Sequence, residues 1–241
     1  MTKGNKLTII YVEGETDEIF LDFYLENLID DTNTNIQIVY GDVYSEIKDK
    51  GIKATIGDKV KAFLKEQKLR EEDVESIYHL IDIDGVYLKE DSIQANNKVN
   101  VLTYKSDKIE VKDSKHKRNI IDRNKRKKTQ INKMIKSKVI NTEYKLFYNS
   151  CNLEHVLINQ LNLSKDEKVN NIQSLMVKYE TSEDLEEAIN SAFAIQNING
   201  NVDSCFDKSW EILKNNDSEI LRLSNINILK EFLVGKLILN N

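Results

Sequence analysis

Short apolar runs rich in β-branched residues alternate with longer segments of helical hydrophobic period through the first third of the chain. Apolar runs bounded by polar turns are typical of buried strands, and apolar positions three and four residues apart are typical of helices. The sequence therefore predicts strands at 7–12, 36–40 and 76–83, and helices from Thr16 to about Ile29 and at 54–67. Such alternation indicates an α/β fold with a mostly parallel sheet flanked by helices.

The pattern is less regular after Gly85. Residues 99–104 are a candidate for a further strand, and the segment 105–128 shows no apolar period. The sequence predicts a basic helix at 129–138 and the last strand of the sheet at 144–148. From Leu153 onward, apolar residues recur only at helical spacing. We therefore expect an α/β domain at 1–150, followed by an α-helical C-terminal domain at 151–241.

The composition excludes several classes of protein. The chain has 241 residues and only two cysteines, Cys151 and Cys205, which lie far apart without neighbouring metal ligands. This spacing argues against a disulfide scaffold and against a structural zinc site. No apolar run approaches the roughly 18 residues that span a bilayer, and the first residues lack the apolar stretch of a signal peptide. We expect a cytoplasmic protein.

The net charge of −5 hides an uneven distribution. Between Lys105 and Lys138, fourteen Lys or Arg residues stand against four acids, a local balance of +10 that leaves −15 on the other 207 residues. One interpretation is a cationic face on an acidic body, suited to an anionic partner such as nucleic acid. The other is a solvated, lysine-rich loop. Charge alone leaves both open.

Two acidic motifs follow the first and third predicted strands. Glu13 and Asp17 lie in the stretch Val12-Glu13-Gly14-Glu15-Thr16-Asp17, and Asp82 and Asp84 lie in Asp82-Ile83-Asp84-Gly85. The carboxyl ends of parallel strands meet at one edge of a sheet, where α/β proteins bind ligands. Residues two apart on a strand point to the same side, so Asp82 and Asp84 can act together. If the two strands are neighbours, all four carboxylates converge.

Clustered carboxylates raise one another's pKa values unless a cation compensates their charge. Hard oxygen ligands favour Mg²⁺ or Mn²⁺, and phosphate chemistry is a common use of such a site. The alternative is structural, because an Asp-x-Asp sequence at a strand end is common and Glu-Gly also marks turns.

The order of these motifs on strand, helix, strand, helix and strand resembles the Toprim domain. That domain is shared by type IA topoisomerases, DnaG-type primases, ribonuclease M5, recombination-repair proteins and OLD-family nucleases. The stretch from Val12 to Phe20 is most similar to the OLD and RloB-like branch, and the resemblance covers about residues 7–150. It implies a Toprim-like, Rossmann-like sheet that carries Mg²⁺ or Mn²⁺ on Glu13, Asp17, Asp82 and Asp84. Glu13, Asp82 and Asp84 are then catalytic, with Glu13 also a candidate general acid or base.

The resemblance also implies a function. Members of this branch hydrolyse phosphodiester bonds in DNA or RNA, often in prokaryotic defence against phage and often with an ABC-type ATPase. This chain has no GxxxxGK[ST] motif, so a separately encoded partner would supply the ATPase. OLD-like nucleases also use a lysine near the scissile phosphate, for which Lys105, Lys108, Lys112 and the cluster Lys125, Arg126, Lys127 and Lys128 are candidates. We expect this cluster to bind substrate phosphates.

One further similarity and one alternative remain. The stretch from Asn149 to His155 is similar to an Asn-Pro-x-Phe-Glu stretch of RloB-like proteins, although its proline and phenylalanine are missing, and it makes Glu154 a candidate site residue. The alternative function is a non-catalytic, Toprim-like module that binds nucleic acid. A receiver-like or phosphatase-like domain does not explain Glu13-Gly14. The choice between DNA and RNA and the formation of a homo-oligomer stay open.

Overall fold

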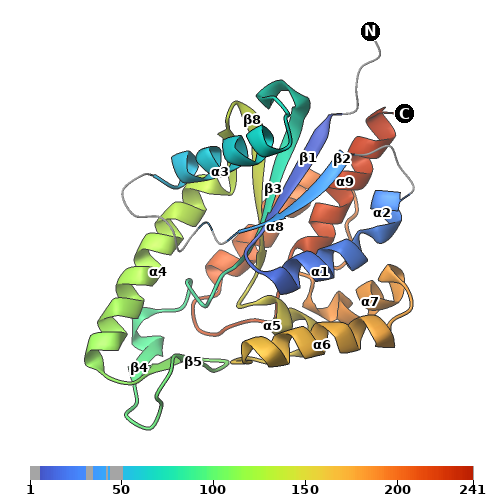
Figure 1. Cartoon of the computed structure of the whole chain (residues 1–241). Helices are drawn as coiled ribbons and strands as arrows, with labels where there is room; N and C mark the ends of the chain where they lie inside the picture. The colour runs from blue at the N-terminus through green and yellow to red at the C-terminus, as the bar shows by residue number, and fades with distance from the viewer. Residues whose placement is uncertain (1–5, 31–34, 42, 44–50, 241) are drawn as a thin grey trace.

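The centre of the protein is a five-stranded sheet in a computed structural model that describes residues 6–30, 35–41, 43 and 51–240 (Figure 1). The strands of this sheet are β1 (Leu7–Val12), β2 (Asn35–Tyr40), β3 (Val74–Asp82), β7 (Lys136–Val139) and β8 (Thr142–Asn149). Their spatial order is β2-β1-β3-β8-β7, and all neighbours are parallel except β7 and β8. The α/β fold with a mostly parallel sheet is therefore confirmed.

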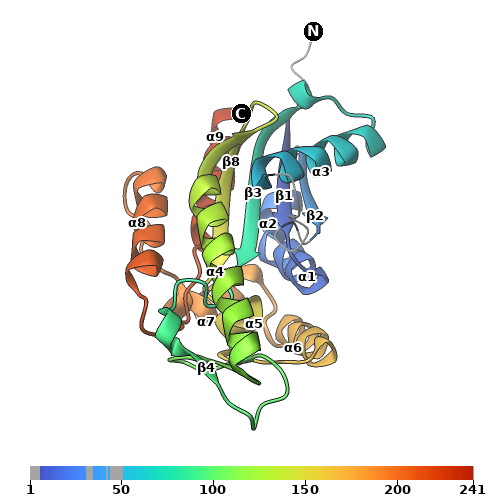
Figure 2. The same cartoon turned by 90° about the vertical axis from the view of Figure 1, so that its left-hand side faces the viewer.

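Helices flank this sheet. They are α1 (Glu15–Tyr24), α2 (Glu26–Asp30), α3 (Ile52–Glu66), α4 (Ser114–Met134), α5 (Leu153–Ile158), α6 (Lys165–Lys178), α7 (Ser182–Ile189), α8 (Val202–Asn215) and α9 (Ile226–Asn240). The helices α3 and α4 cover one face of the sheet, whereas α9 packs on the other (Figure 2). Among the described residues, no helix is both long and apolar enough to cross a membrane.

The register of the central strands explains why residues distant in sequence meet. Val12 at the end of β1 lies beside Leu80 of β3, and Asp82 at the end of β3 lies beside Asn149 of β8. All six residues of β1 are buried, as expected for a strand with neighbours on both sides and helices on both faces. The carboxyl ends of β1, β3 and β8 therefore form one continuous edge.

The basic segment differs from the prediction. Residues 105–128 are not an irregular loop: β6 (Ile109–Val111) pairs with β4 (Ile93–Ala95) and β5 (Thr103–Tyr104), and the 21-residue helix α4 follows. Asp113 caps this helix by accepting hydrogen bonds from the backbone N–H groups of Lys115 and His116. Few of its side chains are buried, so α4 lacks a strong apolar period. Its lysines and arginines are nevertheless good helix formers.

Three predicted boundaries were also wrong. The helix expected at 129–138 is the end of α4 followed by β7, which pairs with β8 across a two-residue turn. Both turn residues, Ile140 and Asn141, have positive φ angles, as a tight hairpin of this kind requires. The first helix ends at Tyr24 rather than near Ile29, with α2 following as a separate helix. Of the strand expected at 99–104, only Thr103–Tyr104 is extended.

The C-terminal helices share one hydrophobic core with the sheet. Trp210 of α8 stacks edge-on against Tyr148 of β8, with ring centroids 4.8 Å apart. Its indole N–H donates a 3.0 Å hydrogen bond to the carbonyl of Leu146. Phe232 of α9 packs against Phe147 of β8. Trp210 and His79 of β3 thus both lie in the core.

Because the two parts share this core, we expect them to unfold together. Trp210→Ala should lower the free energy of unfolding by about 3–5 kcal/mol, since it removes a large buried side chain. Urea denaturation followed by circular dichroism would measure it. Val177→Ala, which alters a largely exposed residue of α6, should change the free energy by less than about 0.5 kcal/mol. If the sheet unfolds in a separate transition whose midpoint Trp210→Ala does not change, the shared core would be contradicted.

Candidate functional site

The four predicted site carboxylates lie at the carboxyl edge of the sheet. Glu13 directly follows β1, Asp82 ends β3, and the backbone N–H of Asp82 donates a 3.1 Å hydrogen bond to the Glu13 carboxylate. Asp17 lies in the first turn of α1, where its Oδ2 accepts a 2.9 Å hydrogen bond from the N–H of Gly14. A glycine at position 14 leaves room for this hydrogen bond, because a Cβ there would come 3.0 Å from Oδ2 of Asp17.

A left-handed turn places Asp84. Its φ angle is +56° and that of Gly85 is +66°, so two consecutive residues adopt a conformation that most side chains avoid. A side chain on Gly85 would also approach Ile109 and Ile220 to within 3.1 and 3.2 Å. The N–H of Asp84 donates to the carbonyl of Cys151, which follows β8. The Asp-x-Asp-Gly sequence thus encodes both the acids and the turn that holds them.

Burial and mutual repulsion raise the pKa values of two of these acids. Asp17 is only 6% exposed, and burial, followed by the charge of Glu154, raises its pKa to about 7. Burial raises the pKa of Asp82 well above its ordinary value, and the charges of Asp17, Glu13 and Asp84 add to that increase. The cluster therefore holds more negative charge than its surroundings compensate.

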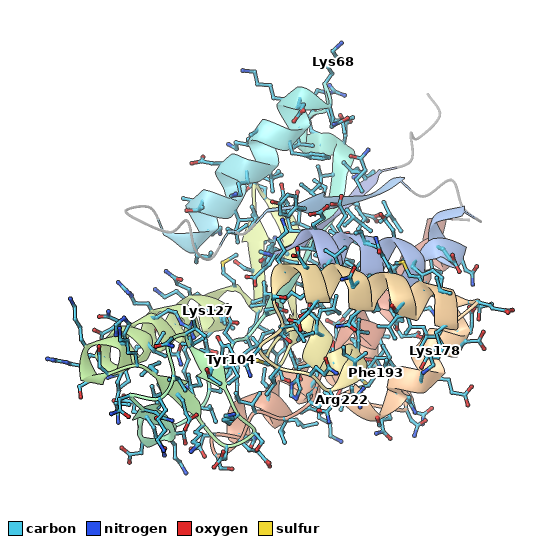
Figure 3. The ribbon with its side chains drawn as sticks, turned by 60° about the horizontal axis from the view of Figure 1, so that its bottom comes forward. Lys68, Tyr104, Lys127, Lys178, Phe193 and Arg222 are labelled. Carbon is cyan, nitrogen blue, oxygen red and sulfur yellow. The ribbon has the colours of Figure 1, made fainter. Side chains whose placement is uncertain are left out.

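Lys127 of α4, labelled in Figure 3, contacts the end of β3 with its ammonium group. Its Nζ donates hydrogen bonds of 2.6 Å to the carbonyl of Asp82 and 2.8 Å to Oδ2 of Asp84, and its side chain is only 12% exposed. Burial alone would lower the pKa of Lys127, but the carboxylates of Glu13 and Asp84 outweigh that effect and raise it. Tyr104, from the small sheet, directs its hydroxyl at the other oxygen of Asp84 at 3.4 Å.

The cluster expected to bind substrate phosphates does not form one patch. Only Lys127 turns toward the acids, because consecutive residues of a helix point in different directions. Lys125 is exposed and pairs with Glu90 at 2.8 Å, Arg126 is exposed, and the Lys128 ammonium lies 5.0 Å from the centre of the Tyr87 ring. The four side chains therefore do not form a single surface beside the acids, and their binding of substrate phosphates stays a prediction.

The structure adds two residues to the cluster, Glu154 of α5 and Lys168 of α6. Glu154 is 1% exposed, and its Oε1 has no hydrogen-bond partner among the described residues. The ammonium of Lys168 lies 2.9 Å from Oε2 of Glu154. The incomplete similarity around Asn149 pointed to Glu154. No sequence signal pointed to Lys168, because the resemblance does not extend to the C-terminal helices.

Tyr40, Tyr44, Tyr87 and Tyr104 lie at or after the ends of predicted strands in the sequence and carry rings of a kind that can stack on unpaired bases. Tyr87 is buried, Tyr104 is half-buried with its hydroxyl directed at Asp84, and Tyr40 at the end of β2 is 60% exposed. Tyr44 lies outside the described residues. Of those described, only Tyr40 presents a ring that an unpaired base could reach from solvent.

The donor set fits a hard divalent cation. It consists of carboxylate oxygens, and the surplus of buried negative charge would be relieved by an ion such as Mg²⁺ or Mn²⁺. The residues that could hold it are Glu13, Asp17, Asp82, Asp84 and Glu154. As these side chains lie, however, no three Asp, Glu, His or Cys residues in the described part of the chain are grouped to hold a metal ion. The ammonium of Lys127 bonds Asp84 in this arrangement.

The raised pKa of Asp17 gives a pH dependence for metal-free protein. Asp17 binds its proton more tightly in the folded state, so the free energy of unfolding should fall as the pH rises from 3.8 to about 7. Asp17→Asn should therefore be more stable than the wild type at pH 8, by about 1–4 kcal/mol, and vary less with pH. Urea denaturation in a chelating buffer at several pH values would measure both quantities.

Asp107→Asn is the matched control, because Asp107 is exposed in a loop, and it should leave the pH profile unchanged. An Asp17→Asn protein less stable than the wild type at pH 8 would contradict the prediction. It would mean that the hydrogen bond from Gly14 to the charged carboxylate outweighs the repulsion.

Comparison with protein-family models, curated proteins and solved structures found no match to this chain. The similarity of its acidic motifs to the Toprim domain therefore remains an expectation from the sequence. The chemical interpretation of the site depends on the acidic cluster itself, with its carboxylates at one edge of the sheet and two lysines beside them.

Proposed function

We propose that the protein is a Mg²⁺- or Mn²⁺-dependent nuclease that hydrolyses phosphodiester bonds in DNA or RNA. One observation carries this proposal: the carboxylates of Glu13, Asp17, Asp82 and Asp84 gather at the carboxyl edge of a parallel sheet, where burial and mutual repulsion raise the pKa values of Asp17 and Asp82. Their negative charge is unfavourable in the protein alone, so it favours a site whose working form contains a cation.

Each side chain has a role that its position supports. A bound divalent cation supplies activation of water and neutralisation of charge on phosphoryl oxygens. Glu13 accepts a hydrogen bond from the backbone of Asp82 at the strand end, which orients its carboxylate as a general acid or base. The left-handed turn fixes the direction of Asp84. The charges of Asp17 and Glu154 act on each other, and Lys168 pairs with Glu154.

Lys127 is the best candidate for the lysine that binds the scissile phosphate. Of the lysines considered from the sequence, it is the one with an ammonium hydrogen-bonded to a site carboxylate. A phosphate that entered beside Asp84 would meet this ammonium directly. Lys168, on the other side at Glu154, could neutralise a second phosphate oxygen.

The wider biological role rests on the resemblance alone. We propose a cytoplasmic effector of a prokaryotic anti-phage or abortive-infection system. A separately encoded ABC-type ATPase would activate it, since the chain has no motif of its own for binding ATP phosphates.

The second candidate function is a non-catalytic module that binds nucleic acid. Two observations favour it: the described carboxylates are not grouped to hold a metal as they lie, and Lys127 already compensates Asp84. In that case Lys127 would be a permanent structural partner of Asp84.

The nuclease proposal predicts that Asp82→Asn and Asp84→Asn abolish cleavage without unfolding the protein. Each removes a negative charge from a crowded site, so the fold should be retained. The experiment incubates the wild type with Mg²⁺ or Mn²⁺ and labelled single- and double-stranded DNA and RNA, with Asp107→Asn as the active control. Wild-type protein that cuts none of these substrates, or variants that cut at its rate, would refute the assignment.

Melting curves separate the two candidate functions. If a cation belongs to the site, millimolar Mg²⁺ or Mn²⁺ should raise the wild-type melting temperature by binding preferentially to the folded state. Glu13→Gln should reduce that rise. A wild-type melting curve indifferent to metal would favour the non-catalytic module.

Lys127→Met should lower kcat about 100-fold or more and change KM much less, because a charge beside the reacting phosphate acts mainly in the transition state. Lys127→Arg should restore part of the loss. The matched control is Lys128→Met, one residue along α4, where the exposed ammonium lies near Tyr87 instead of the acids. Equal losses in the two methionine variants would remove Lys127 from the chemistry.

A further inference from the structure

The side of α4 that faces away from Lys127 carries a row of cations. Lys115, Arg118, Lys125, Arg126 and Lys133 are all exposed, and steps of three, seven or eight residues place them along one side of the helix. We call these five residues the outer cationic face. Asp122 is the acid that interrupts it. The helix forms one border of the molecule in Figure 1 and stands in front of the sheet in Figure 2.

Most of these cations are not paired with an acid at ion-pair distance. Lys125 pairs with Glu90, but within the described part of the chain Lys115, Arg118, Arg126 and Lys133 make no ion pair. Lys115 and Arg118 lie three residues apart, a spacing at which like charges on a helix repel one another. Asp122 lies three or four residues from Arg118, Lys125 and Arg126 and offsets part of their charge. The five cations still outnumber this acid, and an anionic partner would neutralise the charge that remains.

The chemistry of the face indicates which anion fits. Protein interfaces have an apolar centre, but the large hydrophobic residues exposed in the described chain are Tyr40, Val101 and Val177, and none lies on α4. Unpaired bases need exposed aromatic rings to stack on, and the face has none. What it offers is charge alone, which suits the phosphates of a nucleic-acid duplex whose bases are already stacked.

The dimensions also fit a duplex. Eighteen residues separate Lys115 from Lys133, about 27 Å along the helix axis at 1.5 Å per residue. A duplex rises 3.4 Å per base pair along each strand, so the face spans about eight base pairs. The acidic cluster lies on the other side of α4, about one helix diameter or 10 Å away. Phosphates on the outer cationic face are therefore flanking phosphates.

We propose that the outer cationic face of α4 binds the phosphate backbone of a nucleic-acid duplex, at a surface separate from the acidic cluster. The binding does not require that the protein cleaves anything. If the protein is the nuclease proposed above, this binding identifies double-stranded nucleic acid as the substrate class. That second step rests on the proposed function.

The test replaces Lys115, Arg118, Arg126 and Lys133 together by Gln in the full chain. The matched control replaces four exposed lysines off this helix, Lys53, Lys65, Lys178 and Lys208, by Gln, so the net charge changes equally. Binding to a 24-base-pair duplex and to a 24-nucleotide single strand is measured by fluorescence anisotropy in EDTA at several salt concentrations. EDTA prevents metal-dependent cleavage during the measurement.

We expect wild type and control to bind the duplex more tightly than the single strand. The α4 variant should lose at least tenfold in duplex affinity at low salt, and its slope of log affinity against log salt should flatten by about three units. An unchanged slope in the α4 variant, an equal loss in the control, or tighter binding to the single strand would each overturn the proposal. So would no binding to either nucleic acid, which would leave an acidic protein as the partner.

The outcome is distinguishable from that of the nuclease proposal. Duplex binding that depends on α4, in a protein that cuts no substrate with Mg²⁺ or Mn²⁺, would refute the nuclease and retain this surface. If Asp84→Asn abolishes cleavage but the α4 replacements leave duplex binding unchanged, the nuclease proposal is retained and the α4 surface is refuted.

Discussion

Repulsion among carboxylates at one edge of the sheet is the constraint on which the rest of the structure depends. Parallel pairing of β1 with β3 and of β3 with β8 brings the ends of three strands together, and each end delivers an acid or its hydrogen-bond partner. Burial removes the water that would otherwise screen the charges. The fold tolerates this arrangement because ammonium groups approach from two sides, one on α4 and one on α6.

The two ammonium groups tie distant parts of the chain to the same place. Lys127 connects α4 to the turn after β3, while the Glu154–Lys168 pair connects α5 to α6 beside α1. The C-terminal helices thus contribute to the site as well as to the core. For this reason, the sheet and the helices after residue 150 are best considered as parts of one working structure.

Features encoded by neighbouring residues could be predicted from the sequence, and features that depend on tertiary packing could not. The strands and the four carboxylates could be predicted, because buried β-branched runs are local and acids at their ends must meet if the strands are parallel. The direction of Lys127 could not, because α4 buries only Asn124, Ile131 and Met134 and its apolar spacing did not define which side faces inward. Lys168 was missed because only tertiary packing brings α6 to the acids.

The two sides of α4 differ in how well they tolerate substitution during evolution. The inner side is fixed by Lys127, Asn124 and Ile131, so a substitution there disturbs the fold or the acidic cluster. The outer side contacts solvent, and exchanging its charged residues leaves packing intact. Mutation can therefore retune attraction to an anionic partner while the chemistry of the carboxylates is inherited unchanged. Substitutions that conserve charge should therefore be tolerated more readily on that exposed side than on the inner side.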